Sequence, residues 1–438
     1  MMFEKYDAYK DSGVEWLGEI PSDWEMISLK RSIDGCFNGL WGSDPKANHD
    51  DIVVLRVADF NRNKLVIDNS KLTFRNIKKS EIGNRLLKKG DLLIEKSGGG
   101  DKTLVGCVVL FNEDYKALTS NFVAKMTPKI NVNSYFLNYF FATLYANNIN
   151  YQSIKQTTGI QNLDTNSYLN EKLVLPSLYE QEAIVNFLNQ KASEIDQAIA
   201  IKEQQIALLN ERKQIVIQKA VTQGLDPNVP MKDSGVEWIG QIPEHWEVIR
   251  SKFLFTQRKE NSKKDDVQLS ATQAYGVIPQ EEYEKRTGKS VVKISLHLDK
   301  RKRVHLNDFV ISMRSFQGGL ERAWAEGCIR SSYVVLKPLK PIDPDYYGYL
   351  FKTPMYIKAL QNTSNFIRDG QDLNFGNFSQ VDLFIVPLSE QKQIVEYIKS
   401  QLGDFEKHLE LLNQQIEKLK EYKTTLINDA VTGKIKVA

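Results

Sequence analysis

The chain carries two copies of one sequence pattern, and this repeat restricts its architecture more than any other feature. The segment KDSGVEWLGEIPSDWE, residues 10–25, returns as KDSGVEWIGQIPEHWE, residues 232–247, with 12 of 16 positions identical. Further along, LPSLYEQEAIVNFL matches VPLSEQKQIVEYI, and their glutamines, Gln181 and Gln391, lie 210 residues apart. An internal repeat of this length predicts two units of related fold.

The two copies share their ends and differ between them. Each has an opening segment, a middle domain that diverges in sequence and length, and a closing helix. We therefore expect four regions in the 438 residues: an opening segment with the first middle domain at 1–175, a long helix at 176–224, a linker with the repeated opening segment and the second middle domain at 225–386, and a second long helix at 387–438.

The middle domains combine the hydrophobic patterns of strands and of helices. The runs IVVLRVADF, GCVVLF, NFVAKMTP, VVKISLHL, DFVISMR and SSYVVLKP are apolar or alternate, which predicts strands. The runs SYFLNYFFATLYANN and PDYYGYLFKTPMYIKALQ predict helical structure. We expect an α+β fold for each middle domain.

The closing segments follow the seven-residue pattern of coiled coils, in which positions a and d are apolar. In the first copy 8 of 10 such positions are apolar, and in the second copy 9 of 10. The first set is Leu188, Ala192, Ile195, Ile199, Lys202, Ile206, Leu209, Lys213, Val216 and Ala220, and the second is Ile398, Leu402, Phe405, Leu409, Leu412, Ile416, Leu419, Lys423, Leu426 and Ala430.

A single amphipathic helix usually covers the core of its own domain. These two are too long for that, because about 45 residues at 1.5 Å each span roughly 67 Å. We expect them to pair with each other, and the order of segments along the chain requires an antiparallel coiled coil with one middle domain at each end. The shared tryptophans are expected to pack where each domain meets the coil, at Trp16, Trp24, Trp238 and Trp246.

Positive charge is concentrated in the middle domains. Residues 26–175 carry 20 Lys and Arg against 14 Asp and Glu, and residues 248–386 carry 22 against 15, which gives net charges of +6 and +7. The whole chain is only +3, so the remainder is −10. This distribution favours contact of both middle domains with a phosphate backbone.

Loops that follow predicted strands combine Arg or Lys with amide side chains and glycine, which suits contact with bases and phosphates. A purely structural turn is the alternative for each loop. The candidates in the first domain are Arg56, Lys96, Ser97, Gly98, Gly99, Lys102, Gln161 and Asn162. Those in the second domain are Gln273, Arg314, Ser315, Phe316, Gln317, Arg322, Arg368 and Gln371, with Arg56 and Gln273 the weakest of all.

The usual motifs of catalysis are missing from the sequence. SGGGDKT at residues 97–103 does not have the spacing of a phosphate-binding loop, and neither the five histidines nor the three cysteines have the spacing of metal ligands. The isolated cysteines, the lack of a signal-like start and the lack of any long apolar run lead us to expect a cytoplasmic protein without a membrane segment.

Several segments in their duplicated order resemble the specificity subunit of type I restriction-modification systems. They are the two tryptophan-containing opening segments, KKGDLLIEKSGGG, GIQNL, GQDLNF and the two glutamine-containing helix starts, and together they cover nearly the whole chain. The resemblance implies two target-recognition domains, each reading one half of a split, asymmetric sequence in double-stranded DNA. It also implies that the coiled coil sets the spacer between the halves.

The same resemblance implies partner proteins. Two modification subunits would dock on the coiled coil and transfer a methyl group from S-adenosylmethionine to adenine N6, and restriction subunits would translocate and cleave DNA. The cofactors S-adenosylmethionine, ATP and Mg are expected on those partners, and none on this chain, which would be non-catalytic.

Two other functions fit part of the pattern. A stand-alone bipartite DNA-binding regulator would share the repeat and the basic domains, but would not need long helices with further polar faces. A coiled-coil protein scaffold would not need basic domains.

Overall fold

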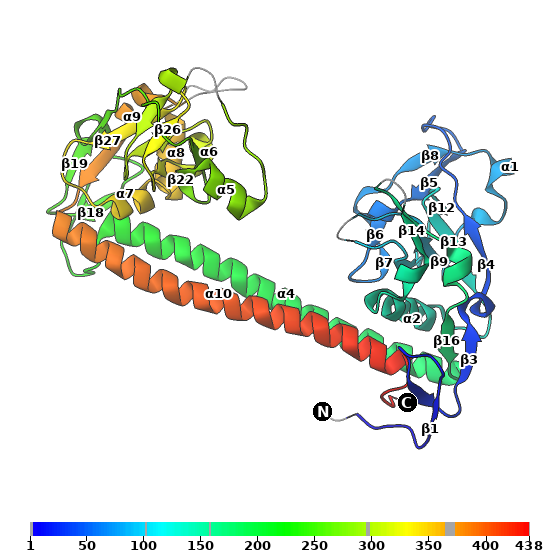
Figure 1. Cartoon of the computed structure of the whole chain (residues 1–438). Helices are drawn as coiled ribbons and strands as arrows, with labels where there is room; N and C mark the ends of the chain where they lie inside the picture. The colour runs from blue at the N-terminus through cyan, green and yellow to red at the C-terminus, as the bar shows by residue number, and fades with distance from the viewer. Residues whose placement is uncertain (1–2, 101–102, 157–158, 295–297, 364–372, 438) are drawn as a thin grey trace. The chain divides into compact units, whose positions relative to one another are not determined.

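The computed structural model describes all residues except 1–2, 101–102, 157–158, 295–297, 364–372 and 438. The chain divides into two compact units, which are described separately. The first contains Met1–Lys202 and Asn413–Ala438, and the second contains Glu203–Leu412. Two long helices, α4 (Leu178–Gln223) and α10 (Leu388–Val431), each contribute to both units (Figure 1). Neither of them, nor any other described helix, is apolar over a length that would cross a membrane.

The first unit is built on a six-stranded sheet in the order β4-β13-β9-β11-β7-β6. Its strands are β4 (Ile33–Asn38), β6 (Phe60–Asn61), β7 (Val66–Ile67), β9 (Leu92–Glu95), β11 (Val108–Leu110) and β13 (Val123–Pro128). Two three-stranded sheets accompany it, one of β5 (Asp51–Leu55), β8 (Phe74–Asn76) and β12 (Ala117–Thr119), the other of β10 (Ser97–Gly98), β14 (Ile154–Gln156) and β15 (Gln161–Leu163). Its remaining helices are α1 (Lys79–Ile82), α2 (Ser134–Ala146) and α3 (Thr165–Tyr168).

The second unit has a four-stranded sheet in the order β20-β27-β24-β25. Its strands are β20 (Phe255–Gln257), β24 (Phe309–Ile311), β25 (Glu321–Arg322) and β27 (Val334–Pro338). Two further pairs are β21 (Leu269–Thr272) with β22 (Gly276–Pro279), and β23 (Lys302–Val304) with β26 (Gly327–Ile329). The helices are α5 (Gln280–Thr287), α6 (Ser315–Gly318), α7 (Pro344–Leu350), α8 (Pro354–Asn362) and α9 (Phe375–Gln380).

The repeated segments have the same local structure in both units. Each opening segment forms a hairpin, β1 (Tyr9–Asp11) with β2 (Glu19–Pro21) and β17 (Met231–Asp233) with β18 (Gln241–Pro243). Each middle domain is then closed by an antiparallel strand pair, β3 (Glu25–Ser28) with β16 (Lys172–Leu175) and β19 (Glu247–Arg250) with β28 (Asp382–Ile385). The chain therefore enters and leaves each middle domain through a pair of matching strands.

A further pair of segments, KKGDLLIEKSGGG from Lys88 and HLNDFVISMRSFQGG from His305, begins with the same local structure in the two units. The Asp91 carboxylate accepts a hydrogen bond from the Lys88 N–H at 2.7 Å just before β9. Asp308 accepts one from the His305 N–H at 2.8 Å just before β24. The same turn thus introduces β9 in the first middle domain and β24 in the second.

Two predicted strands differ from the structure, and one predicted helical run forms two helices. The run IVVLRVADF is a strand only to Leu55, because the Asp59 carboxylate bonds the Arg56 N–H and begins a short 3-10 helix. The described part of VVKISLHL forms no strand, and Val292 there is 80% exposed. The run from Pro344 breaks into α7 and α8, because Thr353 caps a new helix that starts with a proline.

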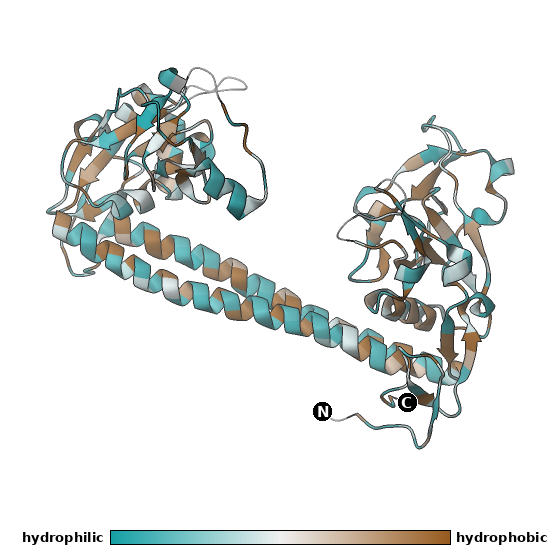
Figure 2. Ribbon diagram, viewed as in Figure 1, coloured by the Kyte–Doolittle hydropathy of each residue, from teal (hydrophilic) through white to brown (hydrophobic). Residues whose placement is uncertain are grey.

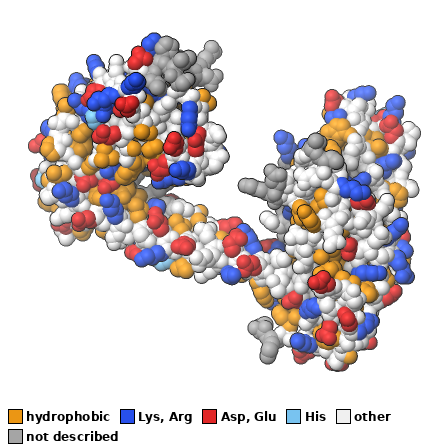
Figure 3. Space-filling view, viewed as in Figure 1, with side chains coloured by type: hydrophobic (Ala, Val, Ile, Leu, Met, Phe, Trp, Pro, Cys, Tyr) orange, Lys and Arg blue, Asp and Glu red, His pale blue; other side chains and the backbone are white. Residues whose placement is uncertain are grey.

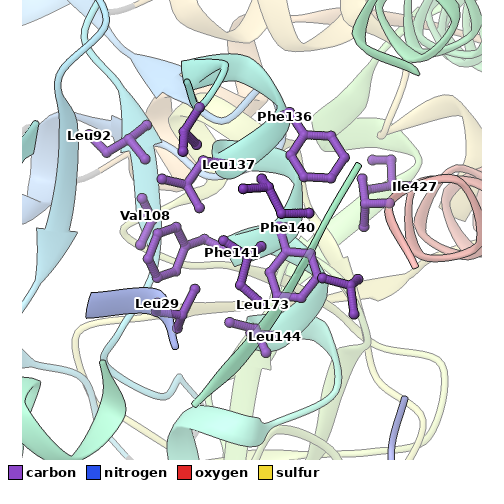
Figure 4. Close-up of a cluster of buried hydrophobic side chains, with 14 of the residues drawn as sticks. Leu29, Leu92, Val108, Phe136, Leu137, Phe140, Phe141, Leu144, Leu173 and Ile427 are labelled. Carbon is purple, nitrogen blue, oxygen red and sulfur yellow. The ribbon is translucent and has the colours of Figure 1, made fainter. Parts of the chain in front are cut away.

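Each unit's core includes the start of one long helix and the end of the other. In the first unit the aromatic face of α2 belongs to one core with Ile184 and Leu188 of α4. Figure 4 shows this face beside Ile427 of α10. In the second unit Ile394 and Ile398 of α10 pack with residues of the end of α4, namely Ala220 and Val221. Trp24 and Trp246 are buried in these two cores, and Trp16 and Trp238 pack against them, so the predicted role of the shared tryptophans is confirmed.

The two long helices run antiparallel within the first unit. Lys423 of α10 forms an ion pair with Asp196 of α4 at 2.8 Å, and Lys202 donates to Gln415 at 2.6 Å. Partners later in α4 thus lie earlier in α10. All twenty predicted a and d side chains are buried or half-buried, and Figure 2 shows the apolar residues recurring along both helices.

Candidate nucleic-acid interface

Two candidate loops of the first domain form one surface. Strand β10 pairs with β15, which places Ser97 opposite Asn162 and Gly98 opposite Gln161. The Ser97 hydroxyl and the Asn162 side-chain oxygen are 2.6 Å apart, and Asn162 is exposed. Sequence reasoning identified these loops separately and did not predict that they pair.

Gln161 supports the glycine-rich loop from behind. Its side chain is only 5% exposed, accepts from the Val105 N–H at 3.1 Å and donates to the Gly100 carbonyl at 3.3 Å. Gly99 has a φ of +67°, and a Cβ there would lie 2.8 Å from the Gln161 Oε1. Glycine is required at this position, because any side chain would collide with the amide that holds the loop.

The charged candidates of the first domain are engaged by neighbouring groups. The Lys96 ammonium donates to the Asn38 side chain at 2.5 Å. The Arg56 guanidinium is paired with Asp59 at 2.7 Å and is 34% exposed. Lys102, as well as Arg368 and Gln371 of the second domain, lies outside the described residues.

In the second domain the corresponding surface is the short helix α6. Arg314 and Gln317 are exposed, whereas Ser315 is buried and accepts from the Ser312 N–H at 2.9 Å. Phe316 is half-buried against the core. Gln273 donates to the Arg314 carbonyl at 3.1 Å and so joins the β21-β22 turn to α6.

Arg322 has its charge compensated by neighbouring groups. Its guanidinium is paired with Asp345, donates to the Asn307 side chain at 2.7 Å and 3.0 Å, and is 13% exposed. These contacts favour a supporting position for Arg322, while its DNA contact and those of the other candidates stay predictions.

A buried carboxylate stands behind the candidate loop in each unit, and sequence reasoning gave neither a role. Glu95 is fully buried, its pKa is raised by burial, and it bonds Arg62 at 2.7 Å. Burial raises the pKa of Glu321 to about 7, and its carboxylate bonds Lys352 at 2.7 Å. Lys352 also donates to the carbonyl of Gly318 in α6 at 2.9 Å, so this pair anchors the helix that carries Arg314.

The candidate loops offer surfaces for binding. Within the described residues, no three His, Cys, Asp or Glu side chains are grouped as metal ligands. Figure 3 shows Lys and Arg side chains scattered among Asp and Glu over the visible face of each unit, without one continuous basic patch. Recognition by such surfaces depends on individual side chains at the loops more than on a single field of charge.

The chain matches known proteins over most of its length. The family model for the type I restriction modification DNA specificity domain matches it twice, at residues 21–211 and 243–421. A protein of Methanocaldococcus jannaschii named as the type I restriction enzyme MjaX specificity subunit is 25% identical over 100% of this chain and 99% of its own length. The MjaVIII specificity subunit of the same organism is 26% identical over 68% of this chain and 70% of its own.

Solved structures share the fold. A chain from a study of complex assembly and conformational transition in the type I R-M system gives a TM-score of 0.64 at 14% identity, with 94% of this chain and 98% of that chain covered. The HsdS subunit of Thermoanaerobacter tengcongensis gives a TM-score of 0.52 at 14% identity, with 95% and 98% covered. At this identity the likeness concerns the fold alone.

Proposed function

The chain belongs to the type I restriction modification DNA specificity family, and from this premise we propose that its two middle domains each read one half of a split DNA target. As a specificity subunit it supplies DNA target recognition to a restriction-modification system. The observation that carries the proposal is the pair of matching strand frames, β3-β16 and β19-β28, that enclose two divergent domains.

The two middle domains present different surfaces between equivalent strand pairs, so we expect them to read different half-sites. The first domain presents a glycine-containing strand pair at Ser97 and Asn162, and the second presents a short helix with Arg314 and Gln317. An Arg side chain suits guanine and amide side chains suit adenine, so the two surfaces have different base preferences. The target is therefore asymmetric. The net charges of +6 and +7 on the middle domains support contact of both with DNA.

The long helices are proposed to set the spacer and to seat two modification subunits. The a and d side chains are used in packing, yet α4 also carries Leu208 and Ile215, seven residues apart and 64% and 56% exposed. Apolar side chains at heptad spacing outside the seam suit a protein partner. This observation favours the subunit over a stand-alone regulator, and the basic domains favour it over a scaffold.

We propose that the partner subunits carry out the methylation and cleavage of DNA. The modification subunits would bind S-adenosylmethionine and methylate adenine N6, and restriction subunits would use ATP and Mg to translocate and cleave DNA. This chain would hold none of these cofactors and act as a non-catalytic subunit in the cytoplasm.

Coexpression with the cognate modification subunit, followed by purification and sequencing of methylated adenines in the host genome, tests the proposal. We expect a complex with two modification subunits and methylation at one split, asymmetric motif. A complex that assembles but methylates no such motif would support the scaffold. Salt-sensitive DNA binding without any complex would support the regulator.

A further inference from the structure

The six tryptophans of the chain fall into two groups. Four belong to the repeated opening segments and pack in or against the cores. The other two, Trp41 and Trp324, lie one in each middle domain and are 37% and 52% exposed. Large aromatic rings held at a protein surface are frequent anchors of contacts with another molecule, which makes these two positions candidates for such a contact.

Each exposed indole is supported by an arginine. The Arg322 guanidinium lies over the Trp324 ring at 4.1 Å from its centre, and the Arg75 guanidinium lies over Trp41 at 4.6 Å. Both arginines are themselves fixed: Arg322 pairs with Asp345, and Arg75 pairs with Asp44 at 2.5 Å.

These arginines are poor candidates for phosphate contacts. Arg75 also donates to the carbonyls of Trp41 and Gly42, at 3.2 Å and 3.3 Å, and its side chain is 15% exposed. With a carboxylate beside each guanidinium and little exposure, little charge is available to DNA. Each arrangement presents an apolar ring to solvent, and the arginine already holds that ring in place. Little side-chain entropy would therefore be lost when the ring binds.

Both rings are connected to the candidate loops of their own domain. The backbone N–H of Trp324 donates to the Val277 carbonyl at 3.0 Å, next to Gly276 in the turn that also holds Gln273 against Arg314. A Cβ on Gly276 would lie 2.7 Å from the Trp324 Nε1, so ring and turn are in close contact.

In the first domain the link runs through the strand that precedes Trp41. Asn38, the last residue of β4, accepts from the Lys96 ammonium at 2.5 Å. Trp41 follows three residues later, and Phe74, beside Arg75 in β8, is 52% exposed. What the two domains share is an exposed tryptophan beneath an arginine, formed from unrelated segments.

We propose that Trp41 and Trp324 are DNA-contacting residues whose exposed faces pack against apolar groups in a DNA groove, one in each half-site. The inference rests on the proposed function. The apolar groups available are the thymine methyl and the deoxyribose, and a flat ring contacts either without a hydrogen bond.

The test uses the full chain in complex with its modification subunits and a duplex that carries the motif read by the wild type. Trp41→Ala and Trp324→Ala should each lower affinity about tenfold or more, whereas Trp41→Phe and Trp324→Phe should cost about threefold or less. Matched controls are Ile130→Ala and Leu339→Ala, exposed apolar residues just after β13 and β27, which should change nothing.

Deoxyuridine in place of thymine distinguishes the two DNA groups. If the ring packs on a thymine methyl, the substituted half-site binds the wild type as weakly as the normal site binds the alanine variant. If it packs on sugar, the substituted site binds normally and the alanine variant remains weak. Alanine variants that are folded and bind like the wild type would overturn the inference.

Acrylamide quenching of the wild-type complex provides a measurement without a variant. Because the other tryptophans are buried or partly buried, we expect target DNA to reduce quenching, and unchanged quenching would contradict the inference. A wild type without any split motif would defeat the proposed function itself. A wild type with its motif and unaffected folded variants would defeat only the role of the tryptophans.

Discussion

At the scale of single residues, Glu321 makes the second unit sensitive to pH. It is 1% exposed, and burial raises the pKa of its carboxyl from 4.5 to about 7. A raised pKa means that its contribution to stability is complete below pH 4.5 and is lost as the pH rises through 7, by on the order of 3 kcal/mol. Raising the pH from 5 to 8 should therefore lower the free energy of unfolding of the wild type more than that of Glu321→Gln. Urea denaturation of both proteins at the two pH values measures this difference. Parallel stabilities of the two proteins would refute this assignment.

Residue roles were the least predictable part of the sequence. The pattern of Arg, Lys, amide and glycine located the surfaces at residues 96–99 and 314–317, but not which side chains are free. Gln161 is consumed in supporting a loop, and Arg322 is compensated by Asp345. Gln161 and its partner Val105 are 56 residues apart in sequence, and Arg322 and Asp345 are 23 residues apart. No local sequence pattern specifies such contacts. For the same reason the stacking of Arg322 on Trp324 was not foreseen.

At the scale of elements, two equivalent glutamines fasten the long helices to their domains. Gln181 accepts from the Asn133 N–H at 2.8 Å and donates to the Pro176 carbonyl at 2.9 Å. Gln391 makes the same bonds to Asp343 at 2.7 Å and Val386 at 2.8 Å. Both are almost completely buried.

Removal of either glutamine should lower the free energy of unfolding by the same amount. Gln181→Ala and Gln391→Ala each leave a buried N–H and a carbonyl without a partner, which is worth about 1–3 kcal/mol. Chemical denaturation measures the loss, and the exposed neighbour Gln393→Ala is the control. Costs that differ widely between the two sites would argue against equivalent helix attachments.

Elements with a strong period were predicted well. The heptad pattern predicted both long helices and the a and d side chains that are buried or half-buried between them, because the pattern repeats over many turns. The middle domains were harder, because their strands are short and their identity depends on partners. The run VVKISLHL has strand composition, but Val292 is left in solvent, and the helical run from Pro344 is broken by the cap at Thr353.

At the scale of the whole molecule, the length of the paired helices should control the target. Extending the register given by Asp196 with Lys423 and Lys202 with Gln415, we pair residues 206–212 of α4 with residues 406–412 of α10. Deleting both heptads removes about 10 Å of helix, close to three base pairs of DNA.

The double deletion should therefore keep both half-sites and shorten the spacer by about three base pairs in the methylated motif. A deletion in one helix alone puts the seam out of register with its partner and serves as the control. An unchanged spacer would mean that the helices do not measure DNA.

We propose that the two middle domains read DNA independently and are held by equivalent pairs of strands. The ends of β3 and β16 correspond to those of β19 and β28, so residues 29–171 are a matched replacement for residues 251–381. The helix positions beneath them correspond as well, since Ile184 and Leu188 occupy in one core the places of Ile394 and Ile398 in the other.

The most direct measurement is the methylated motif of a complex that contains this chain with two copies of the first middle domain. The account predicts that the asymmetric target becomes an inverted repeat of the half-site read by the first domain, with the spacer kept. An assembled complex that still methylates the original asymmetric motif would contradict it.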